Sequence, residues 1–163
     1  MIPNFSLRLD AFFVTFLASF LLWFMFALLI VLWMMKKGVK RQHVVHAVVA
    51  SFFAWGATEI IKSLFPTLRP FQAQNINPLT ITIPTDASFP SAHAASSFAL
   101  ATSIRKNGKL GFAFIVGAIF VSAGRVLGNV HYVADILAGA LIGILAAITV
   151  EKGNINLKKF FKA

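Results

Sequence analysis

The sequence predicts an all-α, polytopic membrane helix bundle that forms one embedded domain over residues 1–163. Hydrophobic residues make up 58% of the chain and charged residues only 12%, against about 25% in soluble domains. The mean hydropathy of +0.81 agrees with this composition. Because each membrane-spanning helix needs roughly 20 residues, the length of 163 residues allows about five transmembrane helices.

Five apolar segments, separated by polar or basic stretches, are expected to form these helices. The first is uncharged and long enough to cross a bilayer with some tilt. It has neither a basic stretch before it nor a small-residue cleavage site, so we expect a retained anchor and not a removed signal peptide. The five segments are residues 11–35, 43–64, 90–104, 110–127 and 132–150.

The third segment is short. Pro90 suits a first helical turn and Ser88 is expected to cap it, while the basic residues from Arg105 onward end it. About 14 residues rise roughly 21 Å at 1.5 Å per residue, which is less than a ~30 Å bilayer core. We therefore expect the start of this helix to lie recessed beneath one membrane face.

The net charge of +10 comes from 15 Lys and Arg residues against 5 Asp and Glu, and their positions predict the orientation. The connections after the first and third segments hold 4 and 3 of these cations, and the C-terminal tail holds 4. The positive-inside rule makes these regions cytoplasmic and places the N-terminus outside. The tail, residues 151–163, is expected on the membrane surface. Topology thus explains most of the charge, and nucleic acid is not expected as a partner.

Three polar clusters interrupt the apolar sequence, and this topology brings all of them to the outer side of the membrane. The clusters are Lys62 with Arg69-Pro70, then Pro90-Ser91-Ala92-His93, and finally Arg125 with His131 and Asp135. Together they contain three cations, two histidines, a hydroxyl group and a carboxylate. We therefore expect one site at the outer face, equipped for phosphoryl chemistry.

Lys62, Arg69 and Arg125 are candidates to bind phosphate oxygens. The start of the third helix adds free N–H groups beside the Ser91 hydroxyl, and this is a favourable place for an anion. Each cation alone also has a simpler interpretation, because Lys62 can extend to the membrane surface and Arg69 can be a surface loop charge.

His131 and Asp135 are four residues apart and share one helix face. A carboxylate beside an imidazole fixes its tautomer, which suits a histidine nucleophile. The alternative is an interfacial histidine, with Asp135 as a structural partner of Arg125. His93 is a candidate proton donor, or else a helix-end histidine in contact with water.

A metal site is not expected, and neither is any other cofactor. Two histidines and a carboxylate can hold a metal ion, but the three nearby cations would repel it. The chain has no Cys, so it offers no thiolate ligand. Glu59 is expected to pair with Lys62 one turn later and to support it. Gly139 and Gly143 are expected to mark helix packing.

The three clusters together resemble the signature of the type-2 phosphatidic-acid phosphatase family of membrane lipid phosphatases. That signature reads K-x6-R-P, P-S-x-H and S-R-x5-H-x3-D, and the resemblance covers roughly residues 50–145. Gly124 stands where the family usually has Ser, which removes one hydroxyl donor, and Ala92 replaces a common Gly. The family often has six spans, whereas this chain is expected to have five.

The resemblance implies a metal-independent lipid phosphatase with no obligate protein partner. It implies that His131 is the nucleophile that forms a phosphohistidine, that Asp135 orients it, and that His93 is the general acid. The residues implied to bind the phosphate are Lys62, Arg69, Ser91 and Arg125.

The stretch from Asp86 to His93 resembles D-x-S-F-P-S-x-H, which is common in bacterial undecaprenyl-diphosphate phosphatases. This resemblance implies hydrolysis of undecaprenyl diphosphate to undecaprenyl phosphate in the bacterial cytoplasmic membrane, in support of cell-wall biogenesis. Phosphatidic acid, phosphatidylglycerol phosphate and lipid A phosphate are alternative substrates. A non-catalytic protein that binds or transports an anionic lipid is a second alternative. Vanadate-dependent oxidases share the pocket, but those relatives are soluble.

Overall fold

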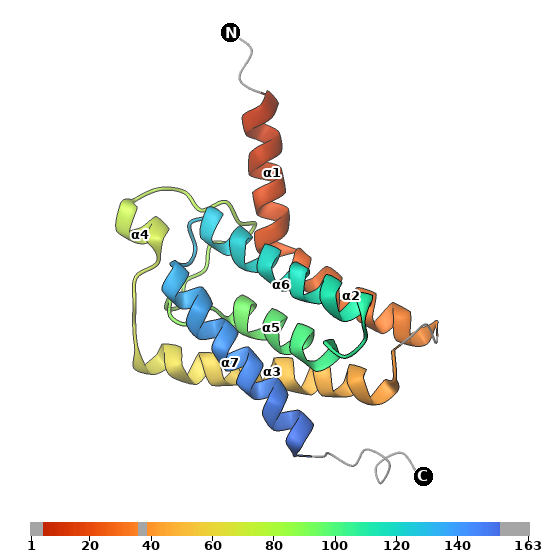
Figure 1. The fold of residues 1–163 in the computed structure, drawn as a ribbon. Helices are drawn as coiled ribbons and strands as arrows, with labels where there is room; N and C mark the ends of the chain where they lie inside the picture. Colours follow the sequence, from red (N-terminus) through yellow and green to blue (C-terminus); the bar gives the residue numbers. More distant parts are fainter. Residues whose placement is uncertain (1–4, 36–38, 154–163) are drawn as a thin grey trace.

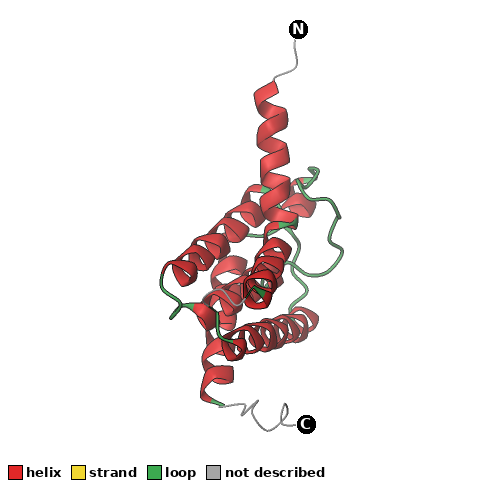
Figure 2. Ribbon diagram, turned by 90° about the vertical axis from the view of Figure 1, so that its right-hand side faces the viewer, coloured by secondary structure: helices red, strands yellow, loops and turns green. Residues whose placement is uncertain are grey.

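The computed structural model describes residues 5–35 and 39–153, and within these ranges it contains seven helices and no strand (Figures 1 and 2). The prediction of an all-α fold is therefore confirmed. The helices are α1 (Phe5–Ser19), α2 (Leu21–Met34), α3 (Arg41–Leu64), α4 (Pro70–Gln74), α5 (Ala92–Ile104), α6 (Lys109–Leu127) and α7 (Val133–Lys152).

The short helix α5 lies at the centre of the bundle, packed against α3, α6 and α7 (Figure 1). Small side chains allow this close packing, since Ala95 and Ala99 are fully buried. A Cβ atom at Gly139 would lie 2.4 Å from the Ser91 carbonyl oxygen, and one at Gly143 would lie 2.2 Å from that of Ala95. The packing role predicted for the two glycines is thus confirmed, and it fixes α7 against the start of α5.

The first apolar segment is not the single helix that the sequence predicts. It forms α1 and α2, which are bent by 57° at a break at Phe20 (Figure 1). The sequence has no Pro or Gly at this point, so local propensity does not cause the break. Instead, the end of α1 packs closely against α6 at Gly124 and accepts a hydrogen bond from Arg125.

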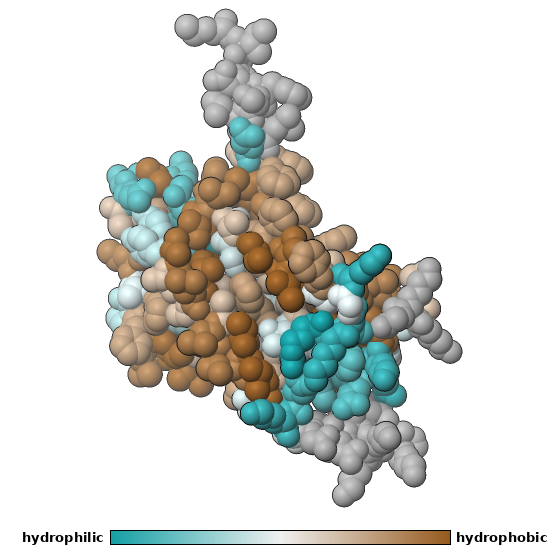
Figure 3. Space-filling view, in the orientation of Figure 1, coloured by the Kyte–Doolittle hydropathy of each residue, from teal (hydrophilic) through white to brown (hydrophobic). Residues whose placement is uncertain are grey.

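Within the described parts of the chain, three helices, α3, α6 and α7, are long and apolar enough to cross a membrane, and the bent pair α1–α2 makes a fourth if it counts as one span. The predicted number of five is not confirmed, because α5 has only 13 residues. Figure 3 shows hydrophobic residues over the middle of the molecule and hydrophilic residues gathered near α4 and at the opposite end. This distribution matches a protein that spans a bilayer.

The connection between α3 and α5 differs from the prediction in two respects. It contains the short helix α4, which the sequence did not indicate. In addition, α5 begins at Ala92 and is capped by Ser91, whose hydroxyl accepts a hydrogen bond from the Ala94 N–H at 3.4 Å. The prediction that Ser88 is the cap is therefore wrong. Most of the predicted surface tail, residues 154–163, lies outside the described residues.

Candidate active site

A cavity of about 550 Å³ opens between α2, α3 and α5 at the α4 end of the bundle. One part of its lining is polar, and the other is apolar. The polar part includes Glu59 and brings together five residues from the three clusters. They are Lys62, Arg69, His93, Arg125 and His131.

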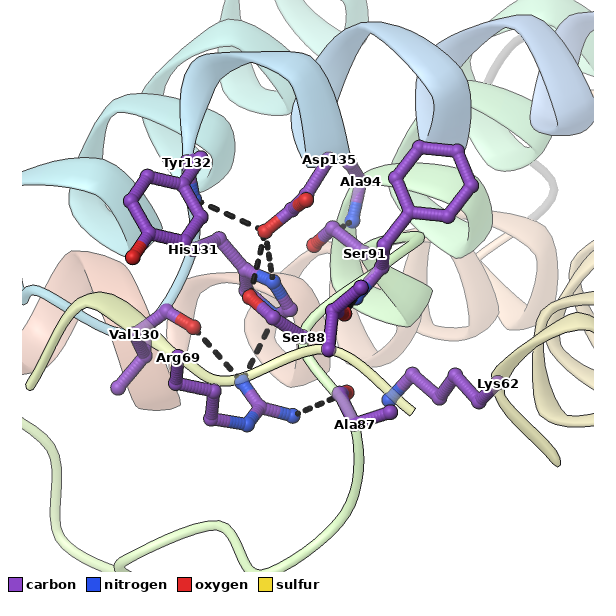
Figure 4. A network of polar contacts seen from close by, with 12 residues as sticks. Lys62, Arg69, Ala87, Ser88, Ser91, Ala94, Val130, His131, Tyr132 and Asp135 are labelled. Carbon is purple, nitrogen blue, oxygen red and sulfur yellow. Dashed lines mark hydrogen bonds and ion pairs between the residues drawn. The ribbon is translucent and has the colours of Figure 1, made fainter. Parts of the chain in front are cut away.

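His131 is held by Asp135 from the side away from the cavity (Figure 4). One carboxylate oxygen, Oδ2 of Asp135, lies 3.3 Å from His131 Nδ1 and accepts hydrogen bonds from Ser88 Oγ at 2.6 Å and the Tyr132 N–H at 2.9 Å. Asp135 stands in the first turn of α7, where a carboxylate interacts favourably with the helix dipole. These contacts fix the orientation of the imidazole.

The neighbours of His131 also define its tautomer. Arg69 Nη1 lies 3.2 Å from His131 Nε2, and a guanidinium group can only donate hydrogen bonds. Nε2 must therefore be the acceptor, and the ring proton is on Nδ1, facing Asp135. Burial, followed by the charges of Arg125 and Arg69, lowers the pKa of His131 from 6.5 to about 4 against the opposing hydrogen bond to Asp135. The imidazole is thus neutral at pH 7, with the Nε2 lone pair available to a substrate.

Arg69 is 1% exposed and uses all five of its N–H groups. Nε donates to the Asp86 carbonyl at 3.0 Å, and Nη1 donates to the Val130 carbonyl at 2.8 Å as well as to His131. Nη2 donates to Asp86 Oδ1 at 2.8 Å. It also donates to the Ala87 carbonyl at 3.2 Å (Figure 4). Arg69 thus ties the loop before α5 to the segment before α7.

Lys62, near the end of α3, is 7% exposed and forms ion pairs with two carboxylates. Its Nζ binds Asp86 Oδ2 and lies 3.8 Å from Glu59 Oε1, so the pair predicted for Glu59 is present. Burial acts to raise the pKa of the Asp86 carboxyl, but the hydrogen bond from Lys62 and the charge of Arg69 outweigh it and hold this pKa below its usual value. Asp86 is therefore ionised between two buried cations.

Arg125, in the last turn of α6, joins the site to the break between α1 and α2. Its Nη1 donates to the Ala18 carbonyl at 2.9 Å. Its Nε is buried and has no hydrogen-bond partner within residues 5–35 and 39–153. An unpaired buried N–H is costly, and because Arg125 lines the cavity, this group is a candidate donor for an anion.

Gly124 allows this arrangement. A Cβ atom here would lie 2.6 Å from Leu17 Cβ and 2.7 Å from the Ala18 backbone nitrogen. Real Cβ atoms do not come so close to a backbone, so the Ser usual in the resembling family would force α1 away. The glycine does lack the hydroxyl donor, but its absence of a side chain is what lets Arg125 reach the carbonyl at the end of α1.

In the second cluster, His93 lines the cavity and Ser91 does not. His93, in the first turn of α5, lines the cavity. Ser91 is fully buried, caps α5 and does not line the cavity, and its backbone N–H donates to the Asp135 carbonyl at 3.0 Å. Its hydroxyl is thus committed to the helix start, and the phosphate-binding role implied for it stays a prediction.

Asp86 and Ser88 are site residues that the sequence reasoning did not assign. Both belong to the stretch from Asp86 to His93 that carries the resemblance, so their position was the available signal. Within the ranges that the structure describes, no group of three or more His, Cys, Asp or Glu side chains is arranged to hold a metal ion.

The described residues form a helical membrane protein in which three buried cations surround a neutral histidine that a carboxylate orients. The profile of the PAP2 superfamily matches residues 44–154, and the chain belongs to this superfamily. It is accordingly a membrane phosphatase of the lipid-phosphate type.

The chain is also similar in sequence to several curated proteins. The chain is 35% identical over 139 residues to the bacitracin transport permease protein BcrC of Bacillus licheniformis, covering 84% of this chain and 68% of that one. It is 29% identical over 126 residues to the putative undecaprenyl-diphosphatase YbjG of Escherichia coli K12, covering 76% and 63%. It is 36% identical over 87 residues to an undecaprenyl-diphosphatase of Sulfolobus acidocaldarius, covering 52% and 42%. The chain thus spans less than two thirds of the length of the last two relatives.

Two solved structures have a similar fold. The crystal structure of LpxE from Aquifex aeolicus matches with a TM-score of 0.71 at 28% identity, covering 92% of this chain and 88% of that one. A PAP2-type phosphatidylglycerolphosphate phosphatase from Bacillus subtilis matches with a TM-score of 0.67, covering 98% and 82%. The second match is only 20% identical and shows the fold alone.

Proposed function

We propose that the protein hydrolyses undecaprenyl diphosphate to undecaprenyl phosphate and inorganic phosphate through a phosphohistidine on His131, without a metal ion. The observation that carries the mechanism is the tautomer of His131, whose unprotonated Nε2 is accepting a hydrogen bond from Arg69. Two curated relatives bear the undecaprenyl-diphosphatase name, which supports the choice of substrate.

The terminal phosphate binds among the cations of the cavity. The free Nε of Arg125 and the ammonium of Lys62 contact its oxygens, and Arg69 joins them as its present partners give way. The start of α5, capped by Ser91, adds the positive end of a helix dipole. Glu59 holds Lys62 in place from the same helix. The negative charge of the phosphate is thereby neutralised before reaction.

The reaction proceeds in two steps. Nε2 of His131 attacks the terminal phosphorus, the bond to the bridging oxygen breaks, and His93 gives a proton to the leaving lipid phosphate. Burial and the charge of Arg125 lower the pKa of His93 in the empty site, and the negative charge of the bound phosphate opposes this shift, so that His93 carries the proton when substrate is bound. Asp135 stabilises the positive charge that develops on the imidazole. A water molecule, deprotonated by His93, then attacks phosphorus and breaks the P–N bond. This step releases inorganic phosphate and restores Nε2.

The apolar part of the cavity suits a lipid chain. It is lined by Leu22, Trp23 and Phe26 of α2 and by Phe52 and Trp55 of α3. Trp23 and Phe52 are each 65% exposed, so the apolar lining continues onto the hydrophobic outer surface of the bundle. A lipid can therefore keep its chain in the bilayer while its phosphate reaches His131.

The positions of the basic residues support an outward-facing site in a bacterial cytoplasmic membrane, with a cytoplasmic C-terminus. Lipid A phosphate and phosphatidylglycerol phosphate are the alternative substrates. Phosphatidic acid fits the same chemistry. A silent lipid-binding protein would have no use for the His131–Asp135 pair.

The test is phosphate release from undecaprenyl diphosphate by purified protein in detergent with EDTA, beside His131→Ala. We expect release that survives chelation and falls by at least about 10⁴-fold in the variant, as expected for loss of a nucleophile. Glu151→Gln, far from the cavity, is the matched control and is expected to retain wild-type activity. Equal release by His131→Ala would rule out the mechanism, and release only from another lipid phosphate would replace the substrate.

A further inference from the structure

The cations that are to bind phosphate are already occupied by a carboxylate of the chain itself. Asp86 Oδ2 binds Lys62 Nζ, and Asp86 Oδ1 accepts a hydrogen bond from Arg69 Nη2 at 2.8 Å. Asp86 also lines the cavity beside His131. Its two carboxylate oxygens thus take positions on two cations that two phosphate oxygens would otherwise take.

The Asp86 carboxylate is more exposed to solvent than the two cations that it binds. The side chains of Lys62 and Arg69 are 6% and 1% exposed, while that of Asp86 is 44% exposed. The cations are fixed by the fold, and Arg69 is held further by the carbonyls of Val130 and Ala87. The carboxylate is the exposed member of the group, so it can leave the two cations without the loss of buried packing that moving either cation would cause.

Arg69 has no spare N–H for a substrate in this state, because all five are used. Two of its bonds end on groups that a reacting phosphate would displace. The Nη1–H that points to His131 Nε2 loses its acceptor when Nε2 bonds to phosphorus, and an Nη2–H is released if Asp86 rotates away. The arrival of phosphate thus frees two donors of Arg69 beside its oxygens.

We propose that Asp86 is a specificity-determining residue that competes with phosphate for Lys62 and Arg69. Its carboxylate weakens the binding of free inorganic phosphate, which has no lipid chain to offset the displacement, and promotes release of the inorganic phosphate product. A lipid-anchored phosphate gains binding energy from the apolar part of the cavity and displaces it. The role in substrate choice rests on the proposed function, but displacement of Asp86 by phosphate can be measured without turnover.

The first test is direct binding of orthophosphate to wild-type protein and Asp86→Asn in detergent, measured by calorimetry at constant ionic strength. Removing a negative charge that lies against the bound anion is expected to tighten binding about tenfold. Glu151→Gln removes a carboxylate that is also held between two cations, Arg105 and Lys106, but away from the cavity, and is expected to bind like wild type. Unchanged or weaker binding by Asp86→Asn would overturn the proposal, as would a lack of binding by both proteins.

A second measurement needs no variant and covers the case in which Asp86→Asn does not fold. Carbodiimide labelling of wild-type carboxylates, read by mass spectrometry, is expected to increase at Asp86 when orthophosphate replaces chloride and to stay constant at Glu151. Labelling of Asp86 that falls or does not change contradicts displacement. Neither test depends on hydrolysis. If the protein were inactive on every lipid phosphate, the proposed function would be refuted, but both tests would still show whether phosphate displaces Asp86.

Discussion

The two ends of the molecule each hold a carboxylate between two cations, and the two triads differ in burial. At the cavity end, Asp86 pairs with Lys62 and Arg69, whose side chains are 6% and 1% exposed. At the other end, Glu151 pairs with Arg105 and Lys106 at 2.7 Å each, and these cations are 35% and 66% exposed. The pairings are alike, but the surroundings are not.

The difference shows what makes such a triad functional. Exposed ion pairs contribute little, commonly 0 to about 1 kcal/mol, because water solvates each partner alone. Buried cations lose that solvation, so they need a partner at all times, and a substrate anion can replace the resident carboxylate. We therefore propose that an anion can bind at the triad around Asp86, whereas the triad around Glu151 is a surface feature.

The largest expected contrast is between Arg69→Lys and Arg105→Lys. A lysine ammonium has three N–H groups and cannot replace the five bonds of Arg69, so we expect about a 100-fold loss of kcat/KM and a loss of roughly 3 kcal/mol in unfolding free energy. Arg105→Lys is expected to change the unfolding free energy by less than about 0.5 kcal/mol and leave kcat/KM as it is. Steady-state kinetics and thermal unfolding test both. Equal effects of the two variants would remove the distinction drawn from burial.

Burial in the cavity also changes the pH at which His131 titrates. Its pKa is 6.5 when unfolded and about 4 in the folded protein, so between these values the unfolded chain binds more protons. The stability from burying neutral His131 is complete above pH 6.5 and is lost as pH falls toward 4, by roughly 2–3 kcal/mol. Thermal unfolding from pH 7 to pH 4 is expected to show a smaller loss in His131→Gln. His131 also stays unprotonated in the free enzyme down to about pH 4–5. If kcat/KM instead fell on the acid side with a pKa near 6.5 that was assigned to His131, this result would contradict the effect of burial on its pKa.

The smallest expected difference concerns two glycines. A Cβ atom at Gly124 would lie 2.7 Å from the Ala18 nitrogen, and one at Gly111, at the other end, would lie 2.6 Å from the Arg105 carbonyl oxygen. We expect both alanine variants to lose about 1–3 kcal/mol of unfolding free energy, as in other overpacked sites. Only Gly124→Ala moves α1 away from Arg125, so only this variant is expected to lower kcat/KM. Gly56→Ala, with nothing within 4 Å of the added Cβ, is the control for both.

The long helices and the positions of most site residues could be predicted from the sequence. Segments 43–64 and 110–127 were predicted for α3 (Arg41–Leu64) and α6 (Lys109–Leu127), because long apolar runs between basic stretches have few other solutions. The order of the polar clusters predicted that His131 and Lys62 would meet, and both line one cavity.

The break at Phe20 and the partners of the loop side chains depend on contacts between segments that are far apart in the sequence. The break depends on the contact of Gly124 with α1 and on the hydrogen bond from Arg125 to Ala18, which no local pattern near residue 20 records. A short polar side chain in a loop has several possible partners within a few residues. Ser88 was therefore predicted as a cap, but packing of α5 against α7 placed its hydroxyl on Asp135, and in the same way the fold placed Asp86 between two distant cations.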